Sequence, residues 1–264
     1  MLALLFTLSA HSAQPIWDAW APGFEVAALP VAGSPHPITV VRLDPAAWCL
    51  SLAAKAETGG PSLTARQWAD QQGFSLVVNA GMFATDHSTH VGFMDISGRA
   101  HGQDSSAYQS VALFGPSQPG LPPYTIVDTD SVSTAALAAA RAQYRYGVQN
   151  LRLIRKPGEN RWSQKPRRWS ELALAEDAEG RPMLIFTRAP FSMHDLNAQL
   201  LAAGIGLVAA QHLEGGPEAQ LFMRVGAREA EMFGSFETGF VEHDRNDHPW
   251  PVPNVIGVRP CAVP

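Results

Sequence analysis

The apolar stretches of this chain are short, and glycine and proline interrupt them throughout. The 264 residues include 22 Gly and 21 Pro, which favour turns and end regular elements. A helical bundle needs long uninterrupted helical periods, so this pattern argues against one. Past the N-terminus, no stretch reaches the roughly 18 apolar residues of a membrane helix. The pattern instead predicts many short strands joined by turns.

The predicted strands alternate irregularly with three helices. Helices are expected at 62–72, where Ser62 is the expected cap, at 133–143, and at 192–203, where Ser192 and Asp195 form a capping box. Strands are expected at 23–29, 37–43, 49–55, 74–81, 91–98, 108–115, 146–154, 168–177, 182–188, 206–216 and 252–258. This order predicts an α+β fold, with mixed, mostly antiparallel sheets and a few flanking helices. We expect one domain over residues 22–262.

The N-terminus and the two cysteines bear on where the protein is located. Residues 1–13, MLALLFTLSAHSA, resemble a secretory signal peptide in their apolar run and small residues, although the first basic residue is Arg42. The alternative is a buried N-terminal strand or helix. A periplasmic or secreted protein would allow Cys49 and Cys261 to pair, whereas a cytoplasmic one would bury both as thiols. The sequence leaves this pairing open.

Charge and missing motifs exclude several classes of function. The formal net charge is −5, which argues against a general nucleic-acid binder. The chain has no GxGxxG after a strand, no Walker motif and no GxSxG. Dehydrogenase, nucleotide hydrolase and α/β-hydrolase functions therefore have no support.

The most informative positions lie at the ends of the two most apolar strands. Each strand delivers a polar residue and then a glycine, which lets the backbone turn sharply and approach a ligand. Ordinary turn chemistry is the alternative reading. The two sets are Asn79 with Gly81, and Glu214 with Gly215, Gly216 and Glu218.

Two further clusters are candidates of lower specificity. Arg167 and Arg168 precede a strand and offer planar forks for phosphate or carboxylate, or they belong to a solvated turn. Histidine and acidic residues gather in two polar loops, 86–90 and 242–248. Neither loop matches a specific metal-ligand spacing, so we expect no metal and treat a divalent cation there as an alternative.

Taken in order, seven segments of the chain resemble the phosphodiester glycosidase family. The resemblance spans about residues 70 to 258 and rests on the ordered series, because no single motif is decisive. The best-known member of this family removes N-acetylglucosamine from a sugar phosphodiester, and the bacterial relatives are mostly exported and uncharacterised. The segments are VVNAGMF, VGFMDISGR, GVQNLRLI, RRWSELALAED, SMHDLNAQLLAAG, AAQHLEGGPEAQL and VPNVIGV.

The resemblance implies roles for several of the candidate residues. The family's Asn-x-Gly-x-Phe segment is matched by Asn79, Gly81 and Phe83, and its Arg before a strand by Arg167 or Arg168. Its Asp-Gly-Gly segment corresponds to Glu214, Gly215 and Gly216, with Glu218 near the position of a serine. The segment Gln149-Asn150-Leu151-Arg152 departs from the Gly-Pro that the family usually has there. The longer acid and the lost serine separate this chain from the usual pattern.

The implied activity is hydrolysis of the glycosidic C–O bond of a sugar 1-phosphodiester, with no cofactor. The leaving phosphate monoester is already a stable anion, so it needs little proton donation. Glu214 would be the base or an electrostatic stabiliser, with Glu218 as second candidate. Asn79 would position a hydroxyl or a water, and one arginine would bind the phosphate. Backbone amides at residues 80–81 and 215–216 would form an anion nest.

Two alternatives belong to other functional classes. One is a non-catalytic exported module that binds a glycan, which the departures around Gly216 make credible. The other is a metal-assisted phosphodiesterase that cleaves the P–O bond with the histidine-rich loops. All three functions predict a small-molecule or glycan partner, no nucleic acid and no membrane span.

Overall fold

Strands dominate the computed structural model, which describes residues 14–262. Over that range, eighteen strands form three sheets, and every pairing between named strands is antiparallel. The fold is therefore richer in strand than α+β implies, and its sheets are not mixed. No helix among these residues is long and apolar enough to cross a membrane. The signal-peptide prediction for 1–13 lies outside the described residues.

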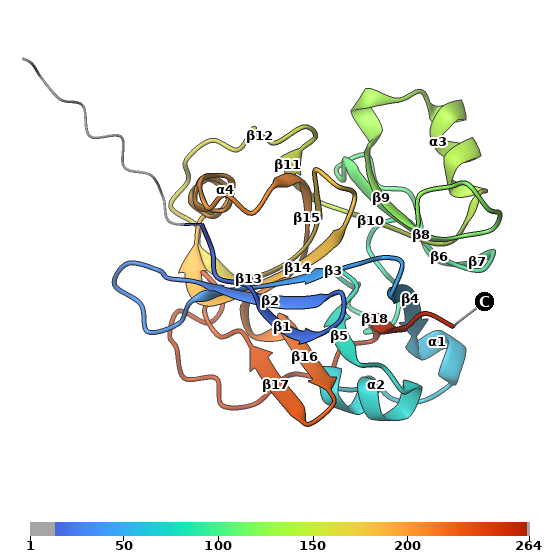
Figure 1. Ribbon diagram of the computed structural model, residues 1–264. Coiled ribbons are helices and arrows are strands. Elements are labelled where there is room, and N and C mark those ends of the chain that lie inside the picture. Colours follow the sequence, from blue (N-terminus) through green and yellow to red (C-terminus); the bar gives the residue numbers. More distant parts are fainter. Residues whose placement is uncertain (1–13, 263–264) are drawn as a thin grey trace, which may run out of the picture.

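The largest sheet has eight strands and carries helix α4 (Met193–Ala202) on one face (Figure 1). Leu196 and Leu200 of α4 are buried in a cluster that includes Ile154 and Ile185 of the sheet. Ser192 caps the helix as predicted, accepting from the Asp195 N–H. In spatial order the strands are β1 (Asp18–Ala21), β2 (Phe24–Leu29), β3 (Ile38–Leu43), β14 (Pro182–Phe191), β13 (Trp169–Asp177), β15 (Leu207–Gly215), β11 (Arg152–Arg155) and β12 (Glu159–Asn160).

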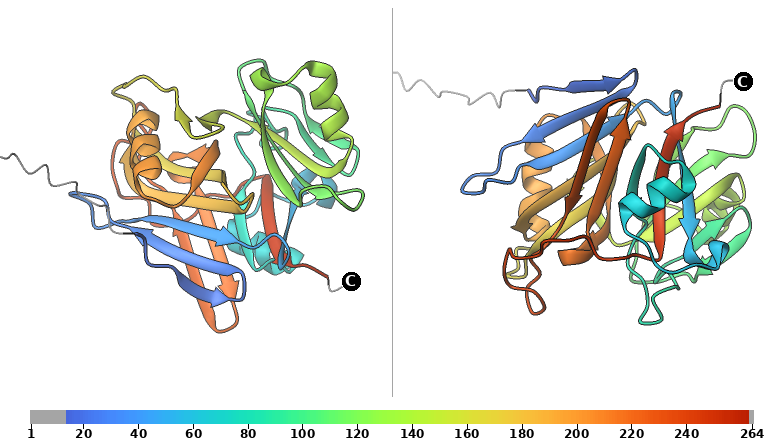
Figure 2. Two further views of the ribbon diagram at one scale, coloured as in Figure 1. Left: turned by 45° about the horizontal axis from the view of Figure 1, so that its top comes forward. Right: turned by 90° about the horizontal axis from the view of Figure 1, so that it is seen from below.

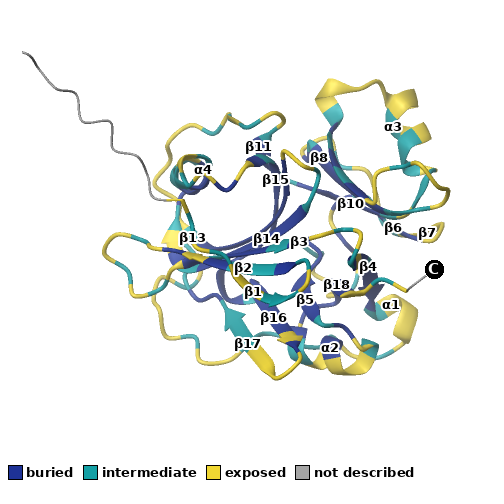
Figure 3. Cartoon of the chain, viewed as in Figure 1, coloured by how far each residue is buried: buried dark blue, intermediate teal, exposed yellow. Residues whose placement is uncertain are grey.

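The second sheet has five strands, and helix α3 (Thr134–Arg141) lies beside it without burying any residue (Figure 3). The short turn η1 (Thr129–Ser131) precedes that helix. In spatial order the strands are β7 (Arg99–Gly102), β6 (Met94–Ile96), β10 (Tyr144–Asn150), β8 (Ser110–Pro116) and β9 (Tyr124–Asp128).

The third sheet is covered by helix α2 (Ala65–Gln72), whose Trp68 is fully buried against it. Its N-cap is Thr64 and not the predicted Ser62, because Thr64 and Gln67 form a reciprocal capping box. Helix α1 (Lys55–Thr58) follows directly after β4. In spatial order the strands are β17 (Arg228–Phe233), β16 (Gln220–Val225), β5 (Leu76–Asn79), β18 (Asn254–Pro260) and β4 (Trp48–Ala54).

The three sheets, seen from two sides in Figure 2, share one hydrophobic cluster. Leu172 of the first sheet, Phe114 of the second and Ile256 of the third belong to it. The sequence pattern did not predict where the chain crosses from the second sheet to the first. The segment 146–154 is not one strand but two, because the chain leaves the second sheet after Asn150 and enters the first at Arg152.

The structure corrects one more strand prediction and adds a hairpin that the sequence pattern did not predict. The segment 91–98 forms a strand only over β6. Gly92, just before it, lies so close to the Gln149 carbonyl oxygen that a Cβ there would be 2.3 Å from it. The hairpin of β16 and β17 was not predicted at all, and its outer strand is only partly buried. The first sheet begins with β1 at Asp18, ahead of the predicted domain start at residue 22.

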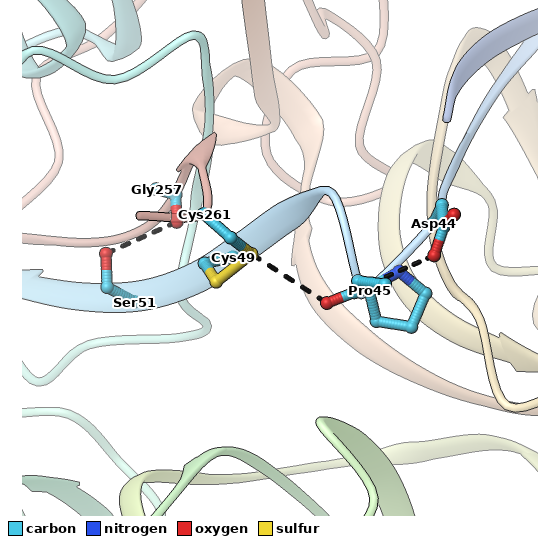
Figure 4. The surroundings of a disulfide bond; sticks show 7 residues. Asp44, Pro45, Cys49, Ser51, Gly257 and Cys261 are labelled. Carbon is cyan, nitrogen blue, oxygen red and sulfur yellow. Dashed lines mark hydrogen bonds between the residues drawn. A yellow bond between two sulfur atoms is a disulfide. The ribbon is translucent and has the colours of Figure 1, made fainter. Parts of the chain in front are cut away.

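Cys49 of β4 and Cys261, just after β18, form a disulfide (Figure 4). This confirms the pairing that an exported protein allows. β4 and β18 are already partners, and Ser51 donates a hydrogen bond to the Gly257 carbonyl oxygen beside the bridge. The bond links positions 212 residues apart, so it ties β4 to the end of the last strand.

Candidate active site

The two strand ends selected from the sequence meet at Gln220. β15 ends at Gly215 and continues through the short turn η2 (Gly216–Glu218) into β16, which pairs with β5. The Gln220 N–H donates to Asn79 Oδ1 over 3.2 Å. The backbone two residues after Glu218 therefore lies beside Asn79 at the end of β5.

Asn79 is fully buried at the end of β5. Its Oδ1 is used by Gln220, while its Nδ2 has no hydrogen-bond partner in the described part of the chain. A buried donor without a hydrogen-bond partner lowers the stability of the fold. Such a group calls for an explanation, and a role in binding a ligand is one. The role of Asn79 in positioning a hydroxyl or a water stays a prediction.

Gly81 is required by packing as well as by backbone conformation. Its φ is +146°, and a Cβ there would lie 2.1 Å from Asn150 Oδ1 and 2.6 Å from the His90 ring. The neighbouring Ala80 N–H donates to the Asn254 carbonyl oxygen. Part of the predicted anion nest at residues 80–81 is thus already used by the protein itself.

Gln149, at the end of β10, is a hub of backbone contacts. Its Oε1 accepts from the N–H groups of Phe93 and Ser105, and its Nε2 donates to the carbonyl oxygens of Ser105 and Tyr108. The side chain is buried and both its polar atoms are engaged. Its geometry is that of a residue that fixes the loops around it, and binding a substrate would require breaking these bonds.

Glu214 is buried, with 7% of its surface exposed, near the end of β15. Burial, opposed by His212 and assisted by Glu218, raises its pKa to about 8. Its one hydrogen bond comes from the adjacent Gly215 N–H over 3.3 Å, which uses a second amide of the predicted nest. Because Glu214 is mostly protonated at neutral pH, it is better suited to donate a hydrogen bond than to act as a base.

Two further carboxylates lie beside Glu214. Burial and the charge of Glu237 raise the pKa of Glu218, and burial also raises that of Glu237. Glu237 packs over Gly216, whose φ is +61° and where a Cβ would lie 2.7 Å from Glu237 Oε2. No ion pair to Glu214, Glu218 or Glu237 occurs within residues 14–262. The site therefore holds three acids without a basic partner at ion-pair distance.

A buried acid–histidine pair completes the group. His212 Nδ1 lies 2.6 Å from Glu171 Oε1, and the Trp169 indole N–H donates to Glu171 Oε2. Burial raises the pKa of Glu171 despite the opposing effect of His212. Burial alone would lower the pKa of His212, but Glu171, Glu214 and Glu237 raise it above its usual value.

The two candidate arginines are both exposed but differ in their surroundings. Arg167 lowers the pKa of Glu237, which places its charge beside the acidic group. The backbone of Arg168 is held by Thr238, through the Thr238 hydroxyl and the Thr238 N–H. The phosphate-binding role of Arg167 or Arg168 stays a prediction.

The histidine-rich loops have other partners. His90 is buried, its Nε2 lies 3.0 Å from the Gln149 carbonyl oxygen, and burial lowers its pKa to about 4. Asp244 pairs with Arg188 and His36. His87 is exposed, and its charge acts to lower the pKa of Glu218. No group of three or more His, Cys, Asp or Glu residues within 14–262 is arranged to hold a metal ion.

Sequence reasoning missed Glu171, His212 and Glu237. A signal was available for the first two, because each is an ionisable residue inside a strand that is otherwise buried. Glu237 follows β17 in a loop, and nothing in the local sequence marks it. Only the three-dimensional fold places it over Gly216.

The comparison with known proteins agrees with the resemblance seen in the sequence. A family model described as phosphodiester glycosidase matches residues 72–259. No curated protein sequence matches the chain.

Two solved structures share the fold. One is the catalytic domain of zebrafish N-acetylglucosamine-1-phosphodiester alpha-N-acetylglucosaminidase, auto-inhibited by its pro-peptide, with a TM-score of 0.62 and 12% identity over 94% of this chain and 84% of that chain. The other is a hypothetical protein from Synechocystis, with a TM-score of 0.61 and 14% identity. The match covers 94% of this chain but only 64% of the length of the Synechocystis chain. At these identities the likeness shows the fold alone.

Proposed function

Because the chain belongs to the phosphodiester glycosidase family, we propose that it hydrolyses the C–O bond between a sugar and the phosphate of a sugar 1-phosphodiester. The observation that carries the proposal is Glu214, a buried acid with a pKa of about 8. It occupies the position of the family's Asp-Gly-Gly acid. Its proton is retained at neutral pH, so it can face a phosphate anion without repelling it.

Each group of the site has a separate role in this proposed reaction. Protonated Glu214 donates a hydrogen bond to a phosphate oxygen, and Arg167 contributes positive charge at the rim of the site. Glu218, with Glu237 beside it, stabilises the positive charge that develops on the sugar ring as the C–O bond breaks. Asn79 positions a sugar hydroxyl or the water. No step requires a cofactor.

A periplasmic or secreted location is part of the proposal. The Cys49–Cys261 disulfide supports it, because such bonds persist in oxidising compartments and are rare in the cytosol. The apolar run at residues 1–13 points the same way.

The test is hydrolysis of a synthetic sugar 1-phosphodiester by the purified protein, with identification of the products. The proposal predicts free sugar and a phosphate monoester. Release of a sugar 1-phosphate instead would indicate a P–O phosphodiesterase. Binding of the substrate or a glycan by calorimetry, with no turnover, would indicate a non-catalytic binding module.

A further inference from the structure

The Glu171–His212 pair lies in the interior of the eight-stranded sheet, on neighbouring strands. Glu171 is 1% exposed on β13 and His212 is 5% exposed on β15. A register shift between Leu172 and Ala173 in this strand pair accompanies a change of pairing, so that Ala173 lies opposite His212 and Leu172 opposite Glu214. Leu213 is the extra residue of this bulge, and His212 and Glu214 lie on either side of it.

The fold alone gives little reason for this pair. Burying a carboxylate and an imidazole costs solvation that a well-packed apolar pair would not, so such pairs are often neutral or unfavourable for stability. Both carboxylate oxygens of Glu171 nevertheless have a partner, because one lies beside His212 Nδ1 and the other accepts from the Trp169 indole N–H. The Trp169 ring also meets the His212 ring edge-on, with centroids 6.5 Å apart.

The arrangement fixes which nitrogen of His212 is available. Nδ1 is held by Glu171 at 2.6 Å, while Nε2 has no hydrogen-bond partner among the described residues. The charged groups that act on His212 are Glu171 from β13, Glu214 from β15 and Glu237 from the loop after β17. A carboxylate that orients an imidazole and leaves its other nitrogen free is the arrangement of a general base and its orienting partner.

We propose that His212 accepts the proton of the attacking water and that Glu171 is the positioning residue that orients it. The inference rests on the proposed function and adds the group that activates water. The water oxygen forms a bond to the anomeric carbon as the C–O bond to phosphate breaks, and that electron pair stays on the phosphate oxygen. The water proton passes to His212 Nε2 and then to solvent. Glu214, protonated, is left to bind the phosphate.

The experiment measures steady-state kinetics on a synthetic sugar 1-phosphodiester for wild type, His212→Gln and Glu171→Gln. His212→Gln is expected to lower kcat by ~10²–10⁴ with KM within a few-fold. Glu171→Gln is expected to lower kcat less, and to move the acidic limb of the pH profile to lower pH, since the Glu171 carboxylate raises the pKa of His212. The control is His194→Asn, which removes a half-exposed histidine paired with Asp195 at 3.2 Å on α4.

A milder variant keeps the test informative if a buried substitution unfolds the protein. Trp169→Phe retains an aromatic ring but removes the N–H that holds Glu171, and it should lower kcat and displace the NMR titration of the His212 ring proton. An unchanged kcat and pH profile in both His212→Gln and Glu171→Gln, with active wild type, would overturn this inference alone. A folded wild type that hydrolyses no sugar phosphodiester would overturn the proposed function, and this inference with it.

Discussion

Buried carboxylates occur in two regions of the molecule, and the two differ in how their charge is compensated. Beside the junction of the first and second sheets, each acid has a basic partner: Glu176 lies 2.6 Å from Lys156 Nζ, and Asp177 lies 2.7 Å from Arg181 Nε. At the ends of β5 and β15, the buried Glu214 and the half-buried Glu218 have no basic partner at ion-pair distance among the described residues.

The difference separates acids that hold the fold from acids to which we assign a role in binding the substrate. Glu176 Oε2 also accepts from the Ile126 N–H, so this carboxylate fastens β9 to β13. Among the described residues, the Glu214 side chain accepts one hydrogen bond, from the adjacent Gly215 N–H, and its pKa of about 8 keeps it mostly protonated at neutral pH. Uncompensated buried acids with shifted pKa values are typical of functional sites.

The largest expected effect is on catalysis by Glu214→Gln. The amide keeps the shape of the protonated acid, but its N–H is a weaker donor than the carboxylic O–H and has a different geometry. Because this donor faces the charge that develops on the phosphate, we expect kcat on a sugar phosphodiester to fall by up to ~10²–10³, with the melting temperature unchanged or raised at pH 7. Full activity in this variant would remove Glu214 from the chemistry.

The disulfide gives the opposite signature, because it lies away from both groups of acids. Replacing Cys49 and Cys261 by alanine releases a long loop in the unfolded chain and is expected to lower the free energy of unfolding by ~2–5 kcal/mol. The kcat of the folded molecules should be unchanged. Urea unfolding and kinetics on the same sample measure both quantities, and an unchanged midpoint would contradict the expectation.

Asp177→Asn tests the compensated region. Its Oδ1 accepts from the Glu179 and Arg181 N–H groups, and its Oδ2 from Arg181 Nε, in the turn between β13 and β14. Losing this charge should cost about 2 kcal/mol and leave kcat intact. Thermal unfolding followed by circular dichroism would show it, and a loss of activity without a loss of stability would reverse the assignment of the two regions.

The pH dependence of stability separates the regions further. The pKa of Glu214 in the folded protein is about 8, above its ordinary value of 4.5. The protonated form is favoured by folding, so this contribution to stability is complete below pH 4.5 and is lost as the pH rises through about 8. The slope reaches at most about 1.4 kcal/mol per pH unit. Urea unfolding from pH 5 to 9 should show this loss in wild type and a smaller one in Glu214→Gln; identical slopes would contradict the raised pKa.

The smallest expected effect concerns the arginines. Arg167→Ala should raise KM for a charged substrate by roughly 3–10-fold, because one exposed charge contributes about 1 kcal/mol. Arg168→Ala is the matched control, since both side chains are exposed. A larger KM change in Arg168→Ala would exchange the two assignments.

The sequence predicted the strand ends well because a buried apolar strand that delivers a polar residue before glycine is a local signal. Asn79, Glu214 and the β13–β14 hairpin follow from such patterns. Contacts between distant segments leave no local signal. The meeting of Glu237 with Gly216, and the passage of the chain between sheets at Leu151, depend on packing that only the fold supplies.

Hydrolysis in ¹⁸O-labelled water tests most directly whether the site breaks the C–O bond. Free sugar and a phosphate monoester can also arise from attack on phosphorus, so product identity alone does not locate the broken bond. Attack on the anomeric carbon, which we expect, places the label in the released sugar. Label in the phosphate product would show that the P–O bond is broken, and would contradict the roles assigned to Glu214 and His212.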